Sequence, residues 1–247
     1  MYVYLTVVEY RRRYILLAIW SMALFHLFLR RRPSIMAYEL LGTGRSGTFD
    51  LWPNWRQWAI LHFSPELLHP AKPEAINDVH QRLYGPRIAW WWRTFAPKAW
   101  TICLELVEGH GSWNGFTPPK PGATPLSPDE PMAVLTRATI RWRKLSAFWS
   151  RAKLVSATMN CARGLRHSIG IGEVPVIKQA TFSIWESSEA MKAFAYQRTE
   201  HRDVVRDSRK LRWYSEEMFL RMRPVFQLGT ITNVDGIPVN TGIRRAD

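Results

Sequence analysis

The chain has 247 residues, of which 47% are hydrophobic, and this content indicates a folded protein rather than a disordered one. Its formal net charge of +14 predicts a surface that attracts polyanions such as nucleic acid or anionic lipid. The sequence has no zinc-finger spacing, RNP-type aromatic motif or basic heptad helix, so we expect no nucleic-acid partner. Two cysteines, Cys103 and Cys161, are too few for a disulfide framework and favour a reducing cytoplasm.

Residues 1–110 are expected to form a first unit with strands and helices in the order βαββαβ, which is the ferredoxin-like arrangement. The expected strands are Val3–Val8, Ile35–Leu41, Gln57–Phe63 and Trp100–Glu108. The expected helices are Tyr14–Leu29 and Glu74–Phe95. Trp90, Trp91 and Trp92 cannot all point the same way on the second helix, so at least one ring is expected to be exposed.

The segment Tyr14–Leu29 is almost wholly apolar, and arginine triplets flank it at both ends. It spans 16 residues, whereas a helix that crosses a membrane needs about 20. A strand precedes it and no cleavage site follows it, which argues against a signal peptide. We expect a buried first helix; the alternative is an interfacial or membrane-inserted helix whose arginines contact lipid phosphates.

Gly42–Gly47 fits the dinucleotide-binding pattern G-x-G-x-x-G, which functions only where a strand turns into a helix. The following residues, Thr48–Pro53, do not begin a helix. The glycines are therefore expected to serve a turn rather than a nicotinamide or flavin site.

Residues 111–131 are rich in proline and glycine and are expected to be a linker. Residues 132–230 are expected to repeat the first unit, with 231–247 as a tail. The expected strands are Ala133–Trp142, Leu165–Ile171, Ile177–Ile184 and Leu220–Phe226. The expected helices are Leu145–Arg163 and Glu189–Arg209. Ser187 or Ser188 is expected to be the N-cap of the second helix. A turn is expected at Gly172–Pro175 and a helical turn at Ser215–Phe219.

The predicted fold class is α+β, with two ferredoxin-like βαββαβ units in one chain packed as an internal dimeric α+β barrel. Each four-stranded sheet would have one open apolar face, and two such faces would cover each other. The cavity between the sheets is where we expect a ligand.

Four segments carry a family resemblance: Leu135–Thr139, Ile169–Pro175, Gln179–Trp185 and Trp213–Arg221. With these segments in this order, residues 2–230 resemble the spheroidene monooxygenase family of bacterial carotenoid oxygenases. The resemblance implies a haem-dependent monooxygenase that converts an acyclic carotenoid to a ketone. It also implies consumption of O₂ and of electrons from a ferredoxin-like donor.

Two histidines are candidate haem ligands, because imidazole is the usual proximal ligand of b-type haem iron. His201 shares a predicted helix face with Met191, Phe194 and Val204, so it is either a hydrogen-bonded core residue or the iron ligand. His167, in a predicted strand beside Gly170, is the second candidate. Glu173 either lines the cavity or is solvated in its turn, and we favour the solvated interpretation.

The sequence has no Ser-His-Asp arrangement, nucleophile elbow or P-loop, so it assigns no catalytic residue. The predicted function is a carotenoid-oxidising monooxygenase in the cytoplasm, with peripheral contact to the inner face of the membrane. The alternatives are an enzyme of the same architecture with another apolar substrate and a non-catalytic haem- or small-ligand-binding α+β barrel protein.

Overall fold

A computed structural model describes residues 1–44, 52–68, 76–120, 122–150, 162–174, 176–197 and 213–231. The chain divides into two compact units. The first unit comprises residues 1–43, 54–105 and 224–247, and the second comprises residues 44–53 and 106–223. Strands β4 (Lys98–Gly111) and β8 (Tyr214–Thr230) each begin in one unit and end in the other.

The sheet of the first unit is built around β1 (Tyr2–Glu9), a run of β-branched and aromatic residues that is buried on both faces. β1 pairs antiparallel with β3 (Pro53–Ser64) on one side and with β4 on the other. Strand β2 (Ala37–Gly44) lies beyond β3, which gives the order β4-β1-β3-β2. This is the strand order of a ferredoxin-like unit.

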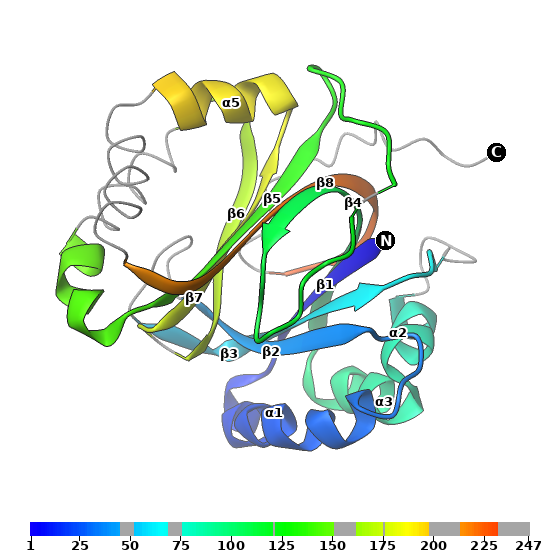
Figure 1. Cartoon of the computed structure of the whole chain (residues 1–247). Helices are drawn as coiled ribbons and strands as arrows, with labels where there is room; N and C mark the ends of the chain where they lie inside the picture. The colour runs from blue at the N-terminus through cyan, green and yellow to red at the C-terminus, as the bar shows by residue number, and fades with distance from the viewer. Residues whose placement is uncertain are drawn as a thin grey trace. The chain divides into compact units, whose positions relative to one another are not determined.

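Helices α1 (Ile15–Leu29), α2 (Ile76–Tyr84) and α3 (Pro86–Phe95) gather on one side of this sheet (Figure 1). Their apolar residues form one core with side chains of the sheet, including Tyr4, Val8, Phe25, Leu83, Trp92 and Cys103. The single helix expected at Glu74–Phe95 is wrong, because Gly85 adopts φ +89 between α2 and α3. Pro86 then begins α3, where a proline is compatible with the first helical turn.

The sheet of the second unit contains β5 (Met132–Ile140), β6 (Leu165–Val174), β7 (Lys178–Trp185) and β8 in the order β8-β5-β7-β6. Helix α5 (Ser188–Gln197) packs Met191 and Phe194 against Trp185. Residues 145–150 are helical, and Phe148 and Trp149 pack with Ile140 and Trp213. The Ser187 hydroxyl accepts a hydrogen bond from the backbone N–H of Ala190 at 3.0 Å, which confirms the predicted N-cap region.

Two expectations for the second unit are wrong. The turn expected at Gly172–Pro175 is strand as far as Val174, with a register shift between Gly172 and Val174. The helical turn expected at Ser215–Phe219 is the beginning of β8, whose Met218, Leu220 and Met222 alternate into a buried face.

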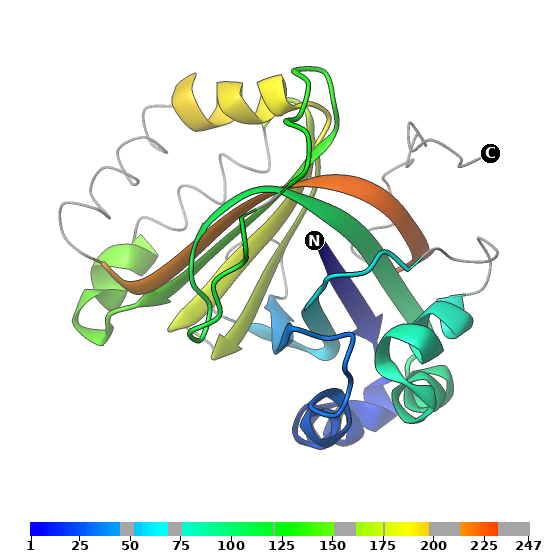
Figure 2. The ribbon, with the colours of Figure 1, turned by 45° about the vertical axis from the view of Figure 1, so that its right-hand side comes forward.

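The fold class is confirmed as α+β with two ferredoxin-like units. Both units have the same strand order, β4-β1-β3-β2 in the first and β8-β5-β7-β6 in the second. The equivalent strands β2 and β6 each carry a Gly-x-Gly sequence, which is Gly42-Thr43-Gly44 in β2 and Gly170-Ile171-Gly172 in β6. Figure 2 shows the helices of each unit against its own sheet.

Candidate functional site

The sheet face of the second unit that points away from α5 is almost wholly apolar. Leu135 lies opposite Phe182 on one side and Leu220 on the other, and Phe182 lies opposite Ile169. Directly opposed residues share a face, so these side chains form one layer, whereas Val134 and Trp185 belong to the core with α5. We call this layer the apolar sheet face; its buried members are Ala133, Leu135, Ile169, Ile171, Ala180, Phe182, Met218, Leu220 and Met222.

His167 lies on the apolar sheet face. It pairs with Ile184 and stands two residues before Ile169, so it shares the direction of that side chain. Its residue is 6% exposed, and burial lowers its pKa from 6.5 to about 4. The imidazole is therefore neutral near pH 7, and the neutral ring is the form that binds metal ions.

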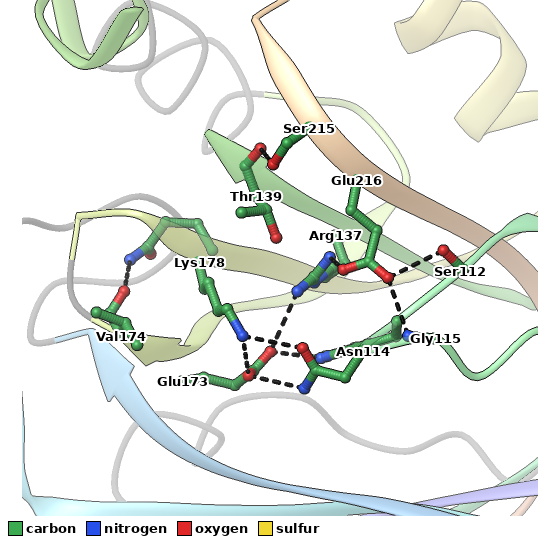
Figure 3. Close-up of polar contacts among 12 residues, drawn as sticks. Ser112, Asn114, Gly115, Arg137, Thr139, Glu173, Val174, Lys178, Ser215 and Glu216 are labelled. Atoms are coloured by element: carbon green, nitrogen blue, oxygen red, sulfur yellow. Dashed lines mark hydrogen bonds and ion pairs between the residues drawn. The ribbon is translucent and has the colours of Figure 1, made fainter. Parts of the chain in front are cut away.

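Arg137 stands at one end of the same face, two residues after Leu135, and its side chain is only 1% exposed. Its guanidinium donates to Glu216 Oε2 at 2.5 Å and to Glu173 Oε1 at 3.4 Å (Figure 3). It also lies over the ring of Trp113, with 5.3 Å between the guanidinium carbon and the ring centre. A buried guanidinium requires such partners, because an unpaired buried charge is costly.

The carboxylate of Glu173 receives three further donors. These are the Trp113 indole N–H at 2.5 Å, the Asn114 amide at 2.9 Å and the Lys178 ammonium at 3.0 Å. Burial alone would raise the pKa of Glu173, but the hydrogen bonds from Asn114, Lys178 and Trp113 and the charge of Lys178 lower it overall. Glu173 is therefore ionised near neutral pH.

Glu216 is held in a similar way. Its Oε1 accepts hydrogen bonds from the Ser112 hydroxyl at 2.9 Å and from the Gly115 backbone N–H at 3.2 Å. Burial raises the pKa of Glu216, and the bonds from Gly115, Ser112 and Arg137 together with the Arg137 charge lower it overall. Arg137 and Lys178 thus balance the charges of the two carboxylates, and we call these four residues with Trp113 the Arg137 cluster.

Part of this site was not expected from the sequence. The solvated interpretation of Glu173 is wrong, since its side chain is only 14% exposed and has four donors. Arg137, Trp113 and Glu216 were not candidates, although Arg137 is the one charged residue in the strand Met132–Ile140, and a charge in a buried strand requires a partner that neutralises it.

The structure places one of the two candidate haem ligands. His167 lies on the apolar sheet face, whereas His201 lies outside the described residues. In the described parts of the chain, no group of three or more His, Cys, Asp or Glu side chains is arranged to hold a metal ion. A haem iron differs from such a site, because it requires only an axial ligand from the protein.

Two buried histidines of the first unit have a different setting. His80 Nε2 and Thr101 Oγ1 are 2.9 Å apart, and His62 stacks on Tyr4 with 4.9 Å between ring centres. Burial lowers the pKa of His62 to about 3 and that of His80 to about 4. Tyr4 belongs to the core between the sheet and the helices, so we interpret these two histidines as core residues.

The chain is similar in sequence to known enzymes. It is 36% identical over 197 residues to the spheroidene monooxygenase of Rhodobacter capsulatus, an alignment that covers 79% of this chain and 78% of the relative. It is 33% identical over 199 residues to the spheroidene monooxygenase of Rubrivivax gelatinosus, with 78% of this chain and 70% of the relative covered. No protein-family model matches the chain.

The fold is similar to that of a solved aldoxime dehydratase, with a TM-score of 0.58 and 10% identity over 90% of this chain and 80% of the dehydratase. At this identity the likeness shows the shared fold alone. The sequence identity to the Rhodobacter enzyme extends over most of both chains and is far higher. The chain is therefore a monooxygenase that belongs to the spheroidene monooxygenase family.

Proposed function

We propose that this monooxygenase oxidises an acyclic carotenoid, or a similar apolar substrate, to a ketone. The oxidised carbon would be allylic or at the methoxy-bearing end of the polyene. The proposal starts from the name of the relatives, spheroidene monooxygenase, which gives an acyclic carotenoid as their substrate. The observation that carries it in this chain is the apolar sheet face with a buried, neutral His167 upon it.

The apolar sheet face suits a hydrocarbon substrate. Its members are aliphatic and aromatic side chains and two methionines, and methionine adapts its shape to irregular apolar surfaces. The charges nearest to it along the strands are those of the Arg137 cluster, which neutralise one another. The face thus offers a polyene dispersion contacts and excludes water without presenting an uncompensated charge.

The balance of the reaction explains the need for an electron donor. Conversion of a methylene group to a ketone removes two hydrogens and adds one oxygen. Two successive monooxygenations achieve this with two molecules of O₂, four electrons and four protons, and three molecules of water are formed. We propose that a reduced ferredoxin-type protein supplies the electrons.

The residues fit a haem as the group that activates O₂, which is the chemistry that haem supplies when bound. His167 would hold the haem iron, because it is a neutral imidazole with apolar neighbours on the same strand. His201 is the other candidate ligand. The apolar sheet face would keep water from the reacting carbon and hold the polyene in one orientation.

The test is product analysis in a bacterial host that accumulates spheroidene and supplies haem. Expression of the chain should yield a carotenoid that has gained one oxygen and lost two hydrogens, detected by mass spectrometry. Unchanged spheroidene in cells that contain the folded protein would refute the proposal.

Alanine variants expressed in the same host identify which histidine binds the haem iron. His167→Ala should abolish ketone formation and the Soret band of the purified protein. His110→Ala is the matched control and should preserve both, because His110 is an exposed histidine of the same unit that stacks on Phe219. If only His201→Ala removes the Soret band, His167 is not the ligand.

A further inference from the structure

Helix α1 has two apolar faces, and only one of them is buried. Ala18, Ser21, Phe25 and Leu29 point into the first unit. At about 100° per residue, Leu16, Ile19, Trp20, Ala23 and Leu27 fall on the opposite side of the helix, and all five are exposed. Leu16 is 72% exposed, Trp20 71% and Leu27 57%. In Figures 1 and 2, α1 runs along the outer edge of the first unit.

The buried face fixes the orientation of α1. The Ser21 hydroxyl and the Tyr10 hydroxyl are 3.2 Å apart, and the ring of Phe25 makes edge contacts with Trp91 and Trp92. Rotation of the helix would break these contacts, so the outer apolar face is a fixed feature of the folded unit. A soluble protein seldom keeps so continuous an apolar strip in water without a partner.

The outer face of α1 does not suit a membrane-spanning helix. The segment Arg12–Leu29 is long and apolar enough to qualify by composition, and 22% of it is buried in the fold. Helix α1 itself has 15 residues and a length of about 22 Å, whereas the bilayer core is about 30 Å thick. A spanning position would also expose Ser21 to lipid and remove Phe25 from its core.

The charges around α1 favour an anionic surface. No acidic residue occurs between Glu9 and Glu39. Arg11, Arg12 and Arg13 are exposed before the helix, and Arg30 and Arg31 are exposed after it. On the neighbouring helix α3, the Arg87 guanidinium lies over the ring of Phe28 at 5.2 Å, which adds a further cation. Cations at both ends of an apolar strip match a bilayer surface, where phosphates flank the acyl region.

We propose that the outer face of α1 lies in the interface of an anionic bilayer and docks the protein on the inner face of the membrane. Leu16, Trp20 and Leu27 would reach the boundary between headgroups and acyl chains, and the arginines would pair with lipid phosphates. A second copy of this chain suits the face less well, because antiparallel pairing of two α1 helices would bring Arg11–Arg13 against Arg30 and Arg31. The proposal does not depend on the substrate, since binding to vesicles is measured without one.

The experiment is flotation of the full chain with phosphatidylglycerol vesicles and with phosphatidylcholine vesicles. The protein should float with the anionic vesicles, and high salt should weaken the binding because it screens the arginines. The triple variant Leu16→Ser, Trp20→Ser, Leu27→Ser should bind about 100-fold more weakly, since it removes apolar area that the bilayer would bury. Replacement of Arg11, Arg12 and Arg13 by glutamine should reduce the preference for the anionic vesicles.

Trp142→Ser is the matched control. Trp142 is 72% exposed and belongs to the second unit, so its loss should leave the binding unchanged. Far-ultraviolet circular dichroism of every variant should match the wild type, because the altered side chains are exposed. Equal binding by the wild type and the triple variant would overturn the proposal. The proposal would also be overturned if the wild type is a dimer that does not bind vesicles and the triple variant is a monomer. The outer face of α1 would then be a site of self-association.

Discussion

Arg137 is the residue whose role is most clearly defined by its contacts. Its guanidinium is buried on β5 and pairs with two carboxylates, one from β6 and one from β8. Breaking a buried ion pair by removing one partner is strongly destabilising, because the other partner keeps its desolvation cost. Arg137 therefore ties three strands of the second unit together through charge.

Arg137→Met should lower the free energy of unfolding by about 3 kcal/mol, because Glu216 loses its paired cation and Glu173 keeps only that of Lys178. Arg166→Met is the matched control, because Arg166 pairs with Glu186 at the surface, where the two side chains are 38% and 57% exposed. That exposed pair should contribute less than about 1 kcal/mol. Urea denaturation of both variants measures the difference, and equal losses would contradict the role assigned to Arg137.

The apolar sheet face and the Arg137 cluster differ in how much of each the sequence predicts. His167 was a candidate because a histidine in an apolar strand is conspicuous, and the structure places it on the apolar sheet face. Glu173 was misinterpreted because its donors Trp113 and Asn114 lie about 60 residues away in the chain, in a segment expected to be a linker. Arg137 was overlooked because its two acceptors become neighbours only through the strand pairing.

At the scale of elements, the end of β4 depends on one glycine. Gly111 adopts φ +88, and a Cβ atom there would lie 2.0 Å from the backbone oxygen of Glu217. The next residue, Ser112, donates its backbone N–H to the same oxygen at 2.9 Å. The close approach of the two backbones at this point is what brings Ser112 and Gly115 to Glu216.

Gly111→Ala should destabilise the protein by about 3 kcal/mol or prevent folding, because a backbone atom blocks the added methyl group. Gly115→Ala is the control: its φ is +81, yet nothing lies within 4 Å of the added Cβ atom. That variant should lose only about 1 kcal/mol from the left-handed conformation. Thermal unfolding distinguishes the two, and similar melting temperatures would count against a tight contact at Gly111.

Periodicity predicted most of the elements but not all of their boundaries. The range of α1 follows directly from its apolar run, whereas the side that faces solvent could not be read from a helix that is apolar all round. The run Ser215–Glu217 resembles a helix start because it is polar, and the strand is revealed by the alternation of Met218, Leu220 and Met222 after it. The helix break at Gly85-Pro86 was not predicted, because the apolar pattern on both sides of it indicates one continuous helix.

At the scale of the whole molecule, the duplicated arrangement was predictable because strand and helix order repeats along the chain. Both units have the strand order that βαββαβ connectivity predicts. The contacts of the Arg137 cluster needed more than this order, since they depend on the register of β5, β6 and β8 and on the path of Ser112–Gly115.

The buried histidines predict how the stability of the molecule depends on pH. His62, His80 and His167 have folded pKa values of about 3, 4 and 4, below the unfolded value of 6.5, because burial disfavours the charged ring. Their neutral form contributes stability that is complete above pH 6.5 and is lost as the pH falls toward 4. Each histidine adds about 1.4 kcal/mol per pH unit to the slope between these limits.

The check is the free energy of unfolding from urea titrations between pH 4.5 and 6.5. The free energy of unfolding should rise with pH. The His80→Gln variant should reduce the slope of this free energy against pH by about 1.4 kcal/mol per pH unit, which corresponds to one proton. A free energy that is constant over this interval would contradict the neutral, buried state of these histidines.

We propose that this member of the spheroidene monooxygenase family transfers oxygen from O₂ to an acyclic carotenoid. The most direct measurement supplies purified protein, loaded with haem, with spheroidene, a reduced ferredoxin and ¹⁸O₂. The claim predicts a ketone whose carbonyl oxygen carries the heavy isotope. A ketone with unlabelled oxygen, or spheroidene recovered unchanged, would contradict it.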